Sequence, residues 1–123
     1  MTDSSNTTEQ PAELSPEDQK LVTLARATRA RAAAQEGAAV RDLDGRTYAG
    51  ATVELPSLSI SAVASCLAMA VASGAKGLEA VVVLSESDSP ATADLDAVRD
   101  FAGTGVPVLS GDPRGSVQGS VTT

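Results

Sequence analysis

The chain of 123 residues contains no histidine and no tryptophan, and it has one tyrosine, one phenylalanine and one cysteine. Without imidazole, Ser–His and Cys–His nucleophilic catalysis and the commonest zinc ligand sets are excluded. The scarcity of aromatic rings leaves no platform on which nucleobases would stack. The single cysteine, Cys66, excludes an intramolecular disulfide and fits a reducing cytoplasm, where we expect the protein to reside. We interpret Cys66 as a small hydrophobic residue of the core.

Positive charge is also scarce, since nine Lys and Arg residues face sixteen Asp and Glu residues and give a net charge of −7. The nearest thing to a basic cluster, Arg26, Arg29 and Arg31, has the helical spacing of a solvated face. We therefore expect no nucleic-acid partner. The N-terminus lacks a basic segment followed by an apolar run, and the longest apolar stretch is too short to span a bilayer comfortably, so we expect no secretory signal and no membrane partner.

Composition divides the chain into one domain with a tail at each end. Residues 1–14 are polar, acidic and without periodicity, which predicts a disordered tail. Residues 15–109 form the predicted domain, whose first helix starts with Ser15 as N-cap and Pro16 as first helical residue. Residues 110–123 are rich in Gly, Ser and Thr, which predicts a flexible C-terminal tail.

Within the domain, residues 37–53 predict a β-hairpin that turns at Asp44-Gly45. Residues 58–72 are apolar almost all round, which predicts a helix covered on both sides, with Ser57 as N-cap and Leu67 and Met69 on its buried face.

The rest of the domain predicts one more strand–helix–strand unit. Residues 78–84 predict a strand buried on both faces, residues 91–102 a helix, and residues 106–109 a last strand that Pro107 places at or near an edge. The expected fold is α/β, a three-layer α/β/α sandwich whose mixed sheet opens with the hairpin.

The stretch EGAAVRDLDGRTYAGATVE at residues 36–54, followed at once by a buried helix, resembles the N-terminal half of cytidine deaminases. In that family the hairpin leads into a helix that opens with Cys-Ala-Glu or His-Ala-Glu, and a later helix opens with Pro-Cys-x-x-Cys. The resemblance implies a cytidine deaminase-like fold with a zinc ion held by three of these side chains. It also implies that the glutamate moves protons while a zinc-bound water attacks cytosine.

The motif residues themselves are replaced in this chain. Laid on the family pattern, Ser61, Ala91 and Asp94 fall at the three ligand positions, and Val63 falls at the position of the glutamate. The chain therefore resembles a divergent member of the family that lacks the zinc-binding and catalytic residues, and we expect neither a metal nor another cofactor. We interpret Asp94 as a solvated acid in the first turn of its helix.

Two residues match the part of the pattern that binds the ribose. Glu54 keeps the acid of the family's Asn-x-Glu, and Thr52 replaces its asparagine. The resemblance implies a substrate-binding role for both, whereas an acid such as Glu54, read by itself, is more often a loop residue that contacts solvent or caps the following helix.

Three hypotheses for function follow. The first is a catalytically inactive, cytidine deaminase-like binding or scaffold protein, homo-oligomeric as the family is, with a pyrimidine nucleoside as a possible ligand. The alternative is an active deaminase that converts cytidine to uridine with a non-standard or borrowed metal site. The third is a small α/β interaction domain whose likeness to deaminases is convergent.

Overall fold

A computed structural model of the protein describes residues 13–87 and 89–123. Of the predicted N-terminal tail, residues 1–12 lie outside the described residues. The helices and strands, in chain order, are α1 (Pro16–Ala32), β1 (Gly37–Asp42), β2 (Thr47–Ala51), β3 (Val53–Leu55), β4 (Leu58–Ile60), α2 (Ala62–Ala72), β5 (Leu78–Leu84), α3 (Thr92–Ala102), β6 (Pro107–Gly111) and β7 (Val117–Thr122).

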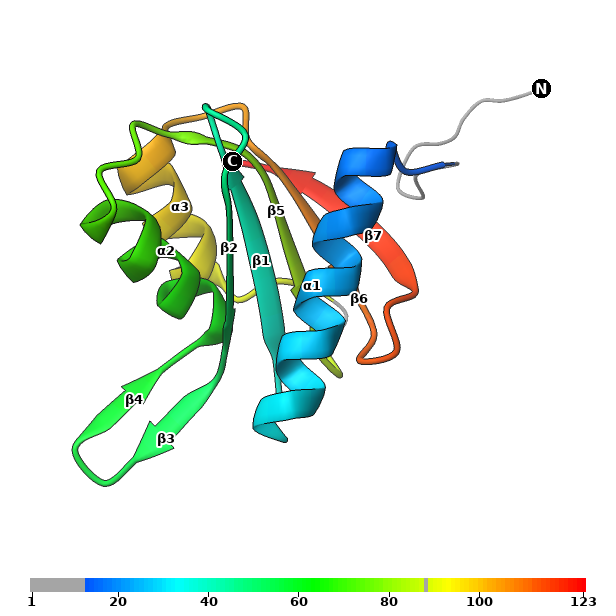
Figure 1. Ribbon diagram of the computed structural model, residues 1–123, viewed down its shortest axis with the longest axis vertical. Coiled ribbons are helices and arrows are strands. Elements are labelled where there is room, and N and C mark those ends of the chain that lie inside the picture. Colours follow the sequence, from blue (N-terminus) through cyan, green and yellow to red (C-terminus); the bar gives the residue numbers. More distant parts are fainter. Residues whose placement is uncertain (1–12, 88) are drawn as a thin grey trace.

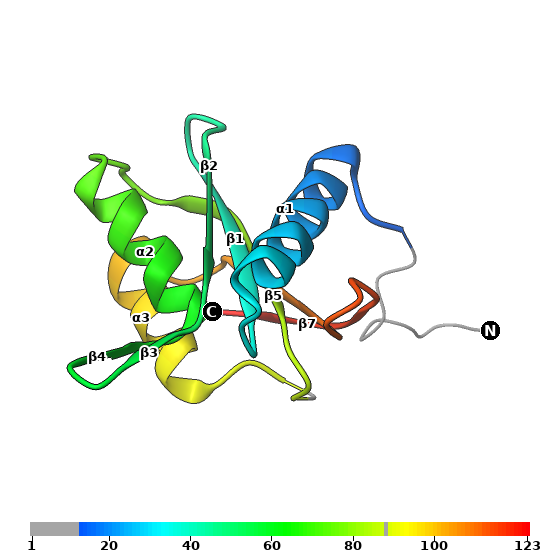
Figure 2. The same ribbon diagram turned by 60° about the horizontal axis from the view of Figure 1, so that its bottom comes forward.

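The predicted three-layer α/β/α sandwich is confirmed. A five-stranded sheet in the order β2-β1-β5-β6-β7 forms the middle layer, with α1 on one face and α2 and α3 on the other (Figures 1 and 2). The sheet is mixed, because β5 and β6 run parallel while the other neighbouring pairs run antiparallel.

Alternation along the central strands produces two separate cores. In β5, Val81 and Val83 pack toward α2 and α3, whereas Val82 and Leu84 pack toward α1. Successive side chains of a strand point to opposite faces. The predicted burial of residues 78–84 on both faces is therefore confirmed for all but Glu79.

Helix α1 begins as predicted, because the Ser15 hydroxyl accepts a hydrogen bond from the Asp18 amide at 3.1 Å and Pro16 is the first helical residue. The helix lies directly against β1 at Gly37. A Cβ atom at Gly37 would come within 2.3 Å of the carbonyl oxygen of Ala25. Glycine at this position sets how closely α1 approaches the sheet.

The central helix is shorter than predicted. Residues 58–60 form β4, which pairs with β3 through a turn at Pro56 and Ser57, so the backbone groups assigned to the first helical turn are used in a strand ladder. The helix starts after Ser61 rather than after Ser57, because the Ser61 hydroxyl caps the amide of Ala64 at 3.0 Å. The β3–β4 hairpin extends away from the sandwich (Figure 1).

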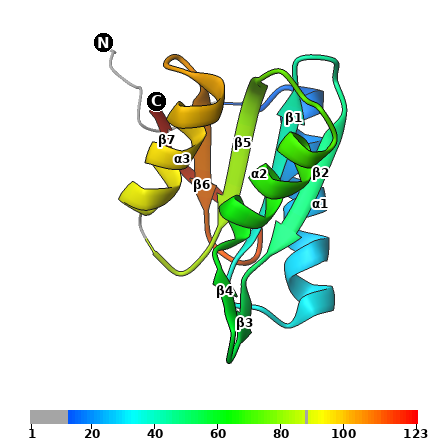
Figure 3. The same cartoon turned by 90° about the vertical axis from the view of Figure 1, so that its left-hand side faces the viewer.

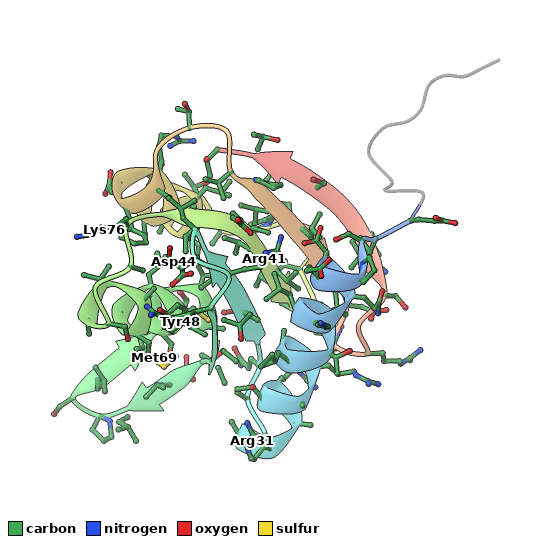
Figure 4. The ribbon with its side chains drawn as sticks, turned by 45° about the horizontal axis from the view of Figure 1, so that its top comes forward. Arg31, Arg41, Asp44, Tyr48, Met69 and Lys76 are labelled. Atoms are coloured by element: carbon green, nitrogen blue, oxygen red, sulfur yellow. The ribbon has the colours of Figure 1, made fainter. Side chains whose placement is uncertain are left out.

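The prediction that this helix is covered on both sides is wrong. Leu67 is buried as predicted, but Met69 is 38 % exposed and Val71 is 55 % exposed. Figure 4 shows Met69 on the α2 side of the molecule, away from α1. The helix has one layer of neighbours, the sheet and α3, so its outer face stays uncovered although its residues are apolar.

The C-terminal segment is not the flexible tail that its composition predicted, because residues 117–122 form β7 and extend the sheet beyond β6. The connecting turn is ordered by Asp112, whose Oδ1 accepts hydrogen bonds from the amides of Arg114 and Ser116. Since β7 is an exposed edge strand, it lacks the apolar run by which buried strands are recognised. It also places Pro107, at the start of β6, one strand in from the edge.

Candidate functional site

The N-terminal ends of α2 and α3 meet at one point, as the resemblance implies. Both helices lie on the same face of the sheet and begin toward the bottom of the view in Figure 3. Ser61 is the N-cap of α2, and Asp94 stands in the first turn of α3. The Ser61 hydroxyl donates a hydrogen bond to Oδ1 of Asp94 at 2.6 Å. Two of the three sequence-predicted ligand positions are thus in direct contact.

Asp94 is not the solvated acid that we expected, since only 7 % of its surface is exposed. The helical pattern of the sequence places Asp94 in the first turn of a helix, but it does not show which element packs beside that helix. Because α3 packs beside α2, the carboxylate of Asp94 lies at the N-terminal end of α2, where the Ser61 hydroxyl replaces water as its hydrogen-bond partner.

The other two motif positions carry no polar group. Ala91 is exposed and is the N-cap of α3 without a side-chain hydrogen bond. Val63 is fully buried, at 0 % exposure, in the core between the sheet and the two helices. A residue that moves protons to a substrate must reach that substrate, and the side chain at position 63 contacts core residues instead.

These residues do not fit a zinc ion. Zinc sites use several Cys, His, Asp or Glu ligands, and here one carboxylate and one hydroxyl are present and already bonded to each other. Within residues 13–87 and 89–123, no group of three or more His, Cys, Asp or Glu side chains is placed to hold a metal ion.

Glu36, which was not predicted from the sequence as a site residue, also lies at the start of α2. Its Oε1 accepts a hydrogen bond from the Ala62 amide at 3.4 Å, and a carboxylate is favoured there by the helix dipole. Glu36 immediately precedes β1, and its contact with Ala62, 26 residues later in the chain, depends on how α2 packs, so no local signal in the sequence marks it.

The two predicted substrate residues lie beside this point. The Thr52 hydroxyl accepts a hydrogen bond from the Glu36 amide at 3.0 Å, so part of its hydrogen-bonding capacity is taken up by the backbone of Glu36. Glu54 is exposed on β3 and does not cap α2. Both residues line a cavity of about 250 Å³ that also includes Gln35, Glu36 and Ser61. The cavity has polar, acidic walls and ends at the capped start of α2.

Cys66 is buried in the same core and does not contribute to this site, as predicted. Burial raises the pKa of its thiol to about 12, while a hydrogen bond from the Gly50 backbone acts in the opposite direction. A thiol with such a pKa stays protonated at neutral pH, and therefore it is neither a nucleophile nor a metal ligand.

A second buried acid lies at the other end of the β1–β2 hairpin. Asp42 accepts hydrogen bonds from the amides of Asp44 and Arg46 and from the Tyr48 hydroxyl, each at 2.9 Å. Figure 4 shows Asp44 and Tyr48 near this turn. Burial raises the pKa of Asp42, but the hydrogen bonds outweigh it and the net pKa lies below the ordinary value. Because every hydrogen-bond partner named for Asp42 belongs to the β1–β2 hairpin, we assign it a structural role.

Comparisons with known proteins agree with the fold. The profile of the cytidine deaminase-like family matches residues 14–115, and the chain therefore belongs to this family. No curated protein matches the sequence.

Solved structures of cytidine deaminases are similar to this chain. That from Mycobacterium leprae is 24 % identical with a TM-score of 0.69, and covers 89 % of this chain and 94 % of its own. That from Burkholderia pseudomallei is 23 % identical with a TM-score of 0.73, and covers 84 % and 90 %. That from Mycobacterium tuberculosis is 20 % identical with a TM-score of 0.66, and covers 76 % and 85 %. At these identities the likeness concerns the fold.

Among the described residues, none of the helices combines the length and the apolar character needed to cross a membrane.

Proposed function

We propose that this protein is a catalytically inactive member of the cytidine deaminase-like family that acts as a homo-oligomeric binding or scaffold protein. The observation that supports the proposal is that the positions matching the family's reaction centre hold Ser61, Ala91 and Asp94, with Val63 buried in the core at the position that matches the family's glutamate.

The chemistry of deamination sets how large the loss is. Attack on cytosine needs a hydroxide at neutral pH, and zinc supplies it by lowering the pKa of its bound water to about 7. General acid–base help contributes about 10²–10⁴ in rate, and the metal contributes several kcal/mol more. Val63 cannot move a proton, and the chain has no histidine to replace it.

The activity test uses cytidine and deoxycytidine with the purified chain, and we expect no turnover above a control without protein. Elemental analysis of the same sample is expected to give no stoichiometric zinc. Turnover that scales with the protein and survives purification would instead support the alternative, an active deaminase with a non-standard or borrowed metal site.

A pyrimidine nucleoside is a possible ligand of the cavity beside Glu54 and Thr52. Titration calorimetry with cytidine and uridine tests this, and Glu54→Gln serves as the comparison because it keeps the size of the side chain and removes its charge. Loss of a binding signal in Glu54→Gln would assign the ligand to this cavity. Equal signals in both proteins would place any ligand elsewhere.

The outer face of α2 and the β3–β4 hairpin support self-association. Residues 55–75 contain no charged side chain, and they hold four of the six exposed large hydrophobic residues in the described part of the chain: Leu55, Leu58, Met69 and Val71. A groove of about 650 Å³ lies between α2 and α3 and is lined by Leu67, Val71 and Phe101, together with alanines and one acid, Asp100.

The partner that we propose for this surface is a second copy of the chain. Two copies, each with a net charge of −7, repel each other through their acidic surfaces, whereas residues 55–75 add no charge to a contact, and Glu54 on β3 and Asp100 in the groove are acids that border it. Apolar area of this kind is typical of contacts between chains.

A matched pair of variants tests the surface. Val71 and Leu43 are each 55 % exposed, but Leu43 lies at the β1–β2 turn, outside the uncharged segment 55–75. We expect light scattering after gel filtration to give a multiple of the 12.3 kDa chain mass for the wild type and for Leu43→Asp. Val71→Asp is expected to give the mass of one chain. A monomeric wild type would contradict the homo-oligomer, and equal effects of the two substitutions would contradict the choice of surface.

A further inference from the structure

We infer that the hydrogen bond between Ser61 and Asp94 has taken the place of a metal ion as the link between the N-terminal ends of α2 and α3. The two residues are 33 positions apart in the chain, so the bond is a tertiary contact and not a local turn. The inference concerns how the domain is held together. It therefore stands or falls separately from the proposed binding function.

Both sides of the bond are built into a helix start. The Ser61 hydroxyl uses its acceptor and its donor at once, because it accepts from the Ala64 amide at 3.0 Å and donates to Asp94 at 2.6 Å. A distance of 2.6 Å is typical of a hydroxyl that donates to a carboxylate, and such bonds are about twice as strong as neutral ones. One hydroxyl thus caps α2 and fixes the first turn of α3.

Burial makes this link costly to lose. Asp94 is 7 % exposed, and the N-cap of its helix, Ala91, makes no side-chain hydrogen bond. If the hydroxyl of Ser61 were removed, the carboxylate would lose its partner in a place that water reaches poorly. A polar group left without a partner in such a place destabilises the folded state.

The chemistry of the three positions explains why no metal is needed. A zinc site at this point would require three donors to converge, and Ala91 supplies none. The two remaining polar side chains are a donor and an acceptor of complementary shape, and they bond directly. The folded state should therefore depend on the Ser61–Asp94 pair and not on zinc.

A double-mutant cycle measures the pair. Ser61→Ala, Asp94→Ala and the double variant are unfolded in urea, and the equilibrium constant for unfolding is compared with that of the wild type. The product of the two single effects should exceed the effect of the double variant about tenfold or more, equivalent to about 1.4 kcal/mol of coupling. The cycle cancels the capping of Ala64, which Ser61→Ala removes in both backgrounds.

Asp96 provides the matched control, because it is an exposed acid on the same helix that pairs with Arg99 and not with Ser61. Combined with Ser61→Ala, Asp96→Ala should act independently, within about twofold. Coupling below twofold in the Asp94 cycle, or equal coupling in both cycles, would overturn the inference. If Asp94→Ala does not fold, Ser61→Thr is compared with Ser61→Ala instead of the cycle. Ser61→Thr should keep the stability of the wild type because it keeps the hydroxyl.

Metal dependence gives a second readout that needs no variant. The Tm of the wild type should be the same in EDTA and in a small excess of zinc chloride. The variant with Ser61→Cys, Ala91→Cys and Asp94→Cys should be less stable than the wild type in EDTA and should regain Tm with zinc. A wild-type Tm that falls in EDTA and returns with zinc would show that the domain is held by a metal, and would overturn the inference.

Discussion

Restoring the family's glutamate at position 63 is expected to damage this protein rather than to activate it. Val63 is 0 % exposed and is surrounded by apolar side chains of the core. At pH 7 an unfolded Glu, whose pKa is about 4.3, is ionised, whereas in the core it must hold its proton. Keeping the proton over about 2.7 pH units, at about 1.36 kcal/mol per unit, costs about 4 kcal/mol.

Val63→Gln is the control, because it introduces the same size and polarity without the charge. Unfolding by urea is followed by far-UV circular dichroism, since the chain has no tryptophan. At pH 7, Val63→Glu should be about 3–4 kcal/mol less stable than Val63→Gln, a large share of the total of about 5–15 kcal/mol typical of domains. The folded pKa of such a Glu is raised, so its penalty grows as pH rises above about 4.3 and should nearly vanish at pH 4.5.

A difference between the two variants of less than about 1 kcal/mol at pH 7, with no dependence on pH, would refute this reasoning. It would mean that side chains at position 63 reach water, and that a polar pocket of the family's kind is open behind the start of α2.

Three further outcomes follow from the structure. Leu67→Ala should cost about 2–5 kcal/mol, whereas Met69→Ala, two residues away on the exposed face, should cost less than about 1 kcal/mol; equal effects in urea unfolding would show that the burial of α2 is misassigned. Cys66 should react with a thiol reagent such as DTNB at pH 8 only as fast as the protein unfolds, because burial raises its pKa to about 12, and rapid labelling of the native chain would contradict this. The depressed pKa of Asp42 contributes stability that is present above its unfolded pKa of about 3.9 and is lost as pH falls through the folded pKa. Tyr48→Phe removes one donor to Asp42, so between pH 5 and pH 2 the variant should lose less Tm than the wild type, and parallel curves would contradict that role.

Local signals in the sequence were sufficient for several elements. Ser15-Pro16 marks the start of α1 because capping involves residues within one turn of each other. The run at residues 78–84 marks a central strand because burial on both faces demands apolar side chains at successive positions. Asp44-Gly45 marks the turn because a tight hairpin turn needs a residue with positive φ, which glycine adopts readily and which Gly45 has.

The start of α2 was predicted four residues too early for a physical reason. Leu58 and Ile60 are as compatible with a helix as with a strand, and their pairing with β3 is what decides between the two. The composition of residues 117–122 likewise gives no strand signal, and β7 exists because β6 offers it an edge. In both cases the strand forms through hydrogen bonds to another segment, and the sequence of the strand alone does not show that this segment will be its partner.

By itself, the sequence determined the α/β/α sandwich, the resemblance to cytidine deaminases and the residue types at the positions that match the family's motifs, because each of these depends on residue types at fixed spacings. The tertiary structure decided what the replaced positions do. It buried Val63 in the core, brought Asp94 to within 2.6 Å of Ser61, and left the apolar outer face of α2 uncovered. These outcomes depend on which helix lies beside which, and that is fixed by the packing of the whole domain and not by any one stretch of the chain.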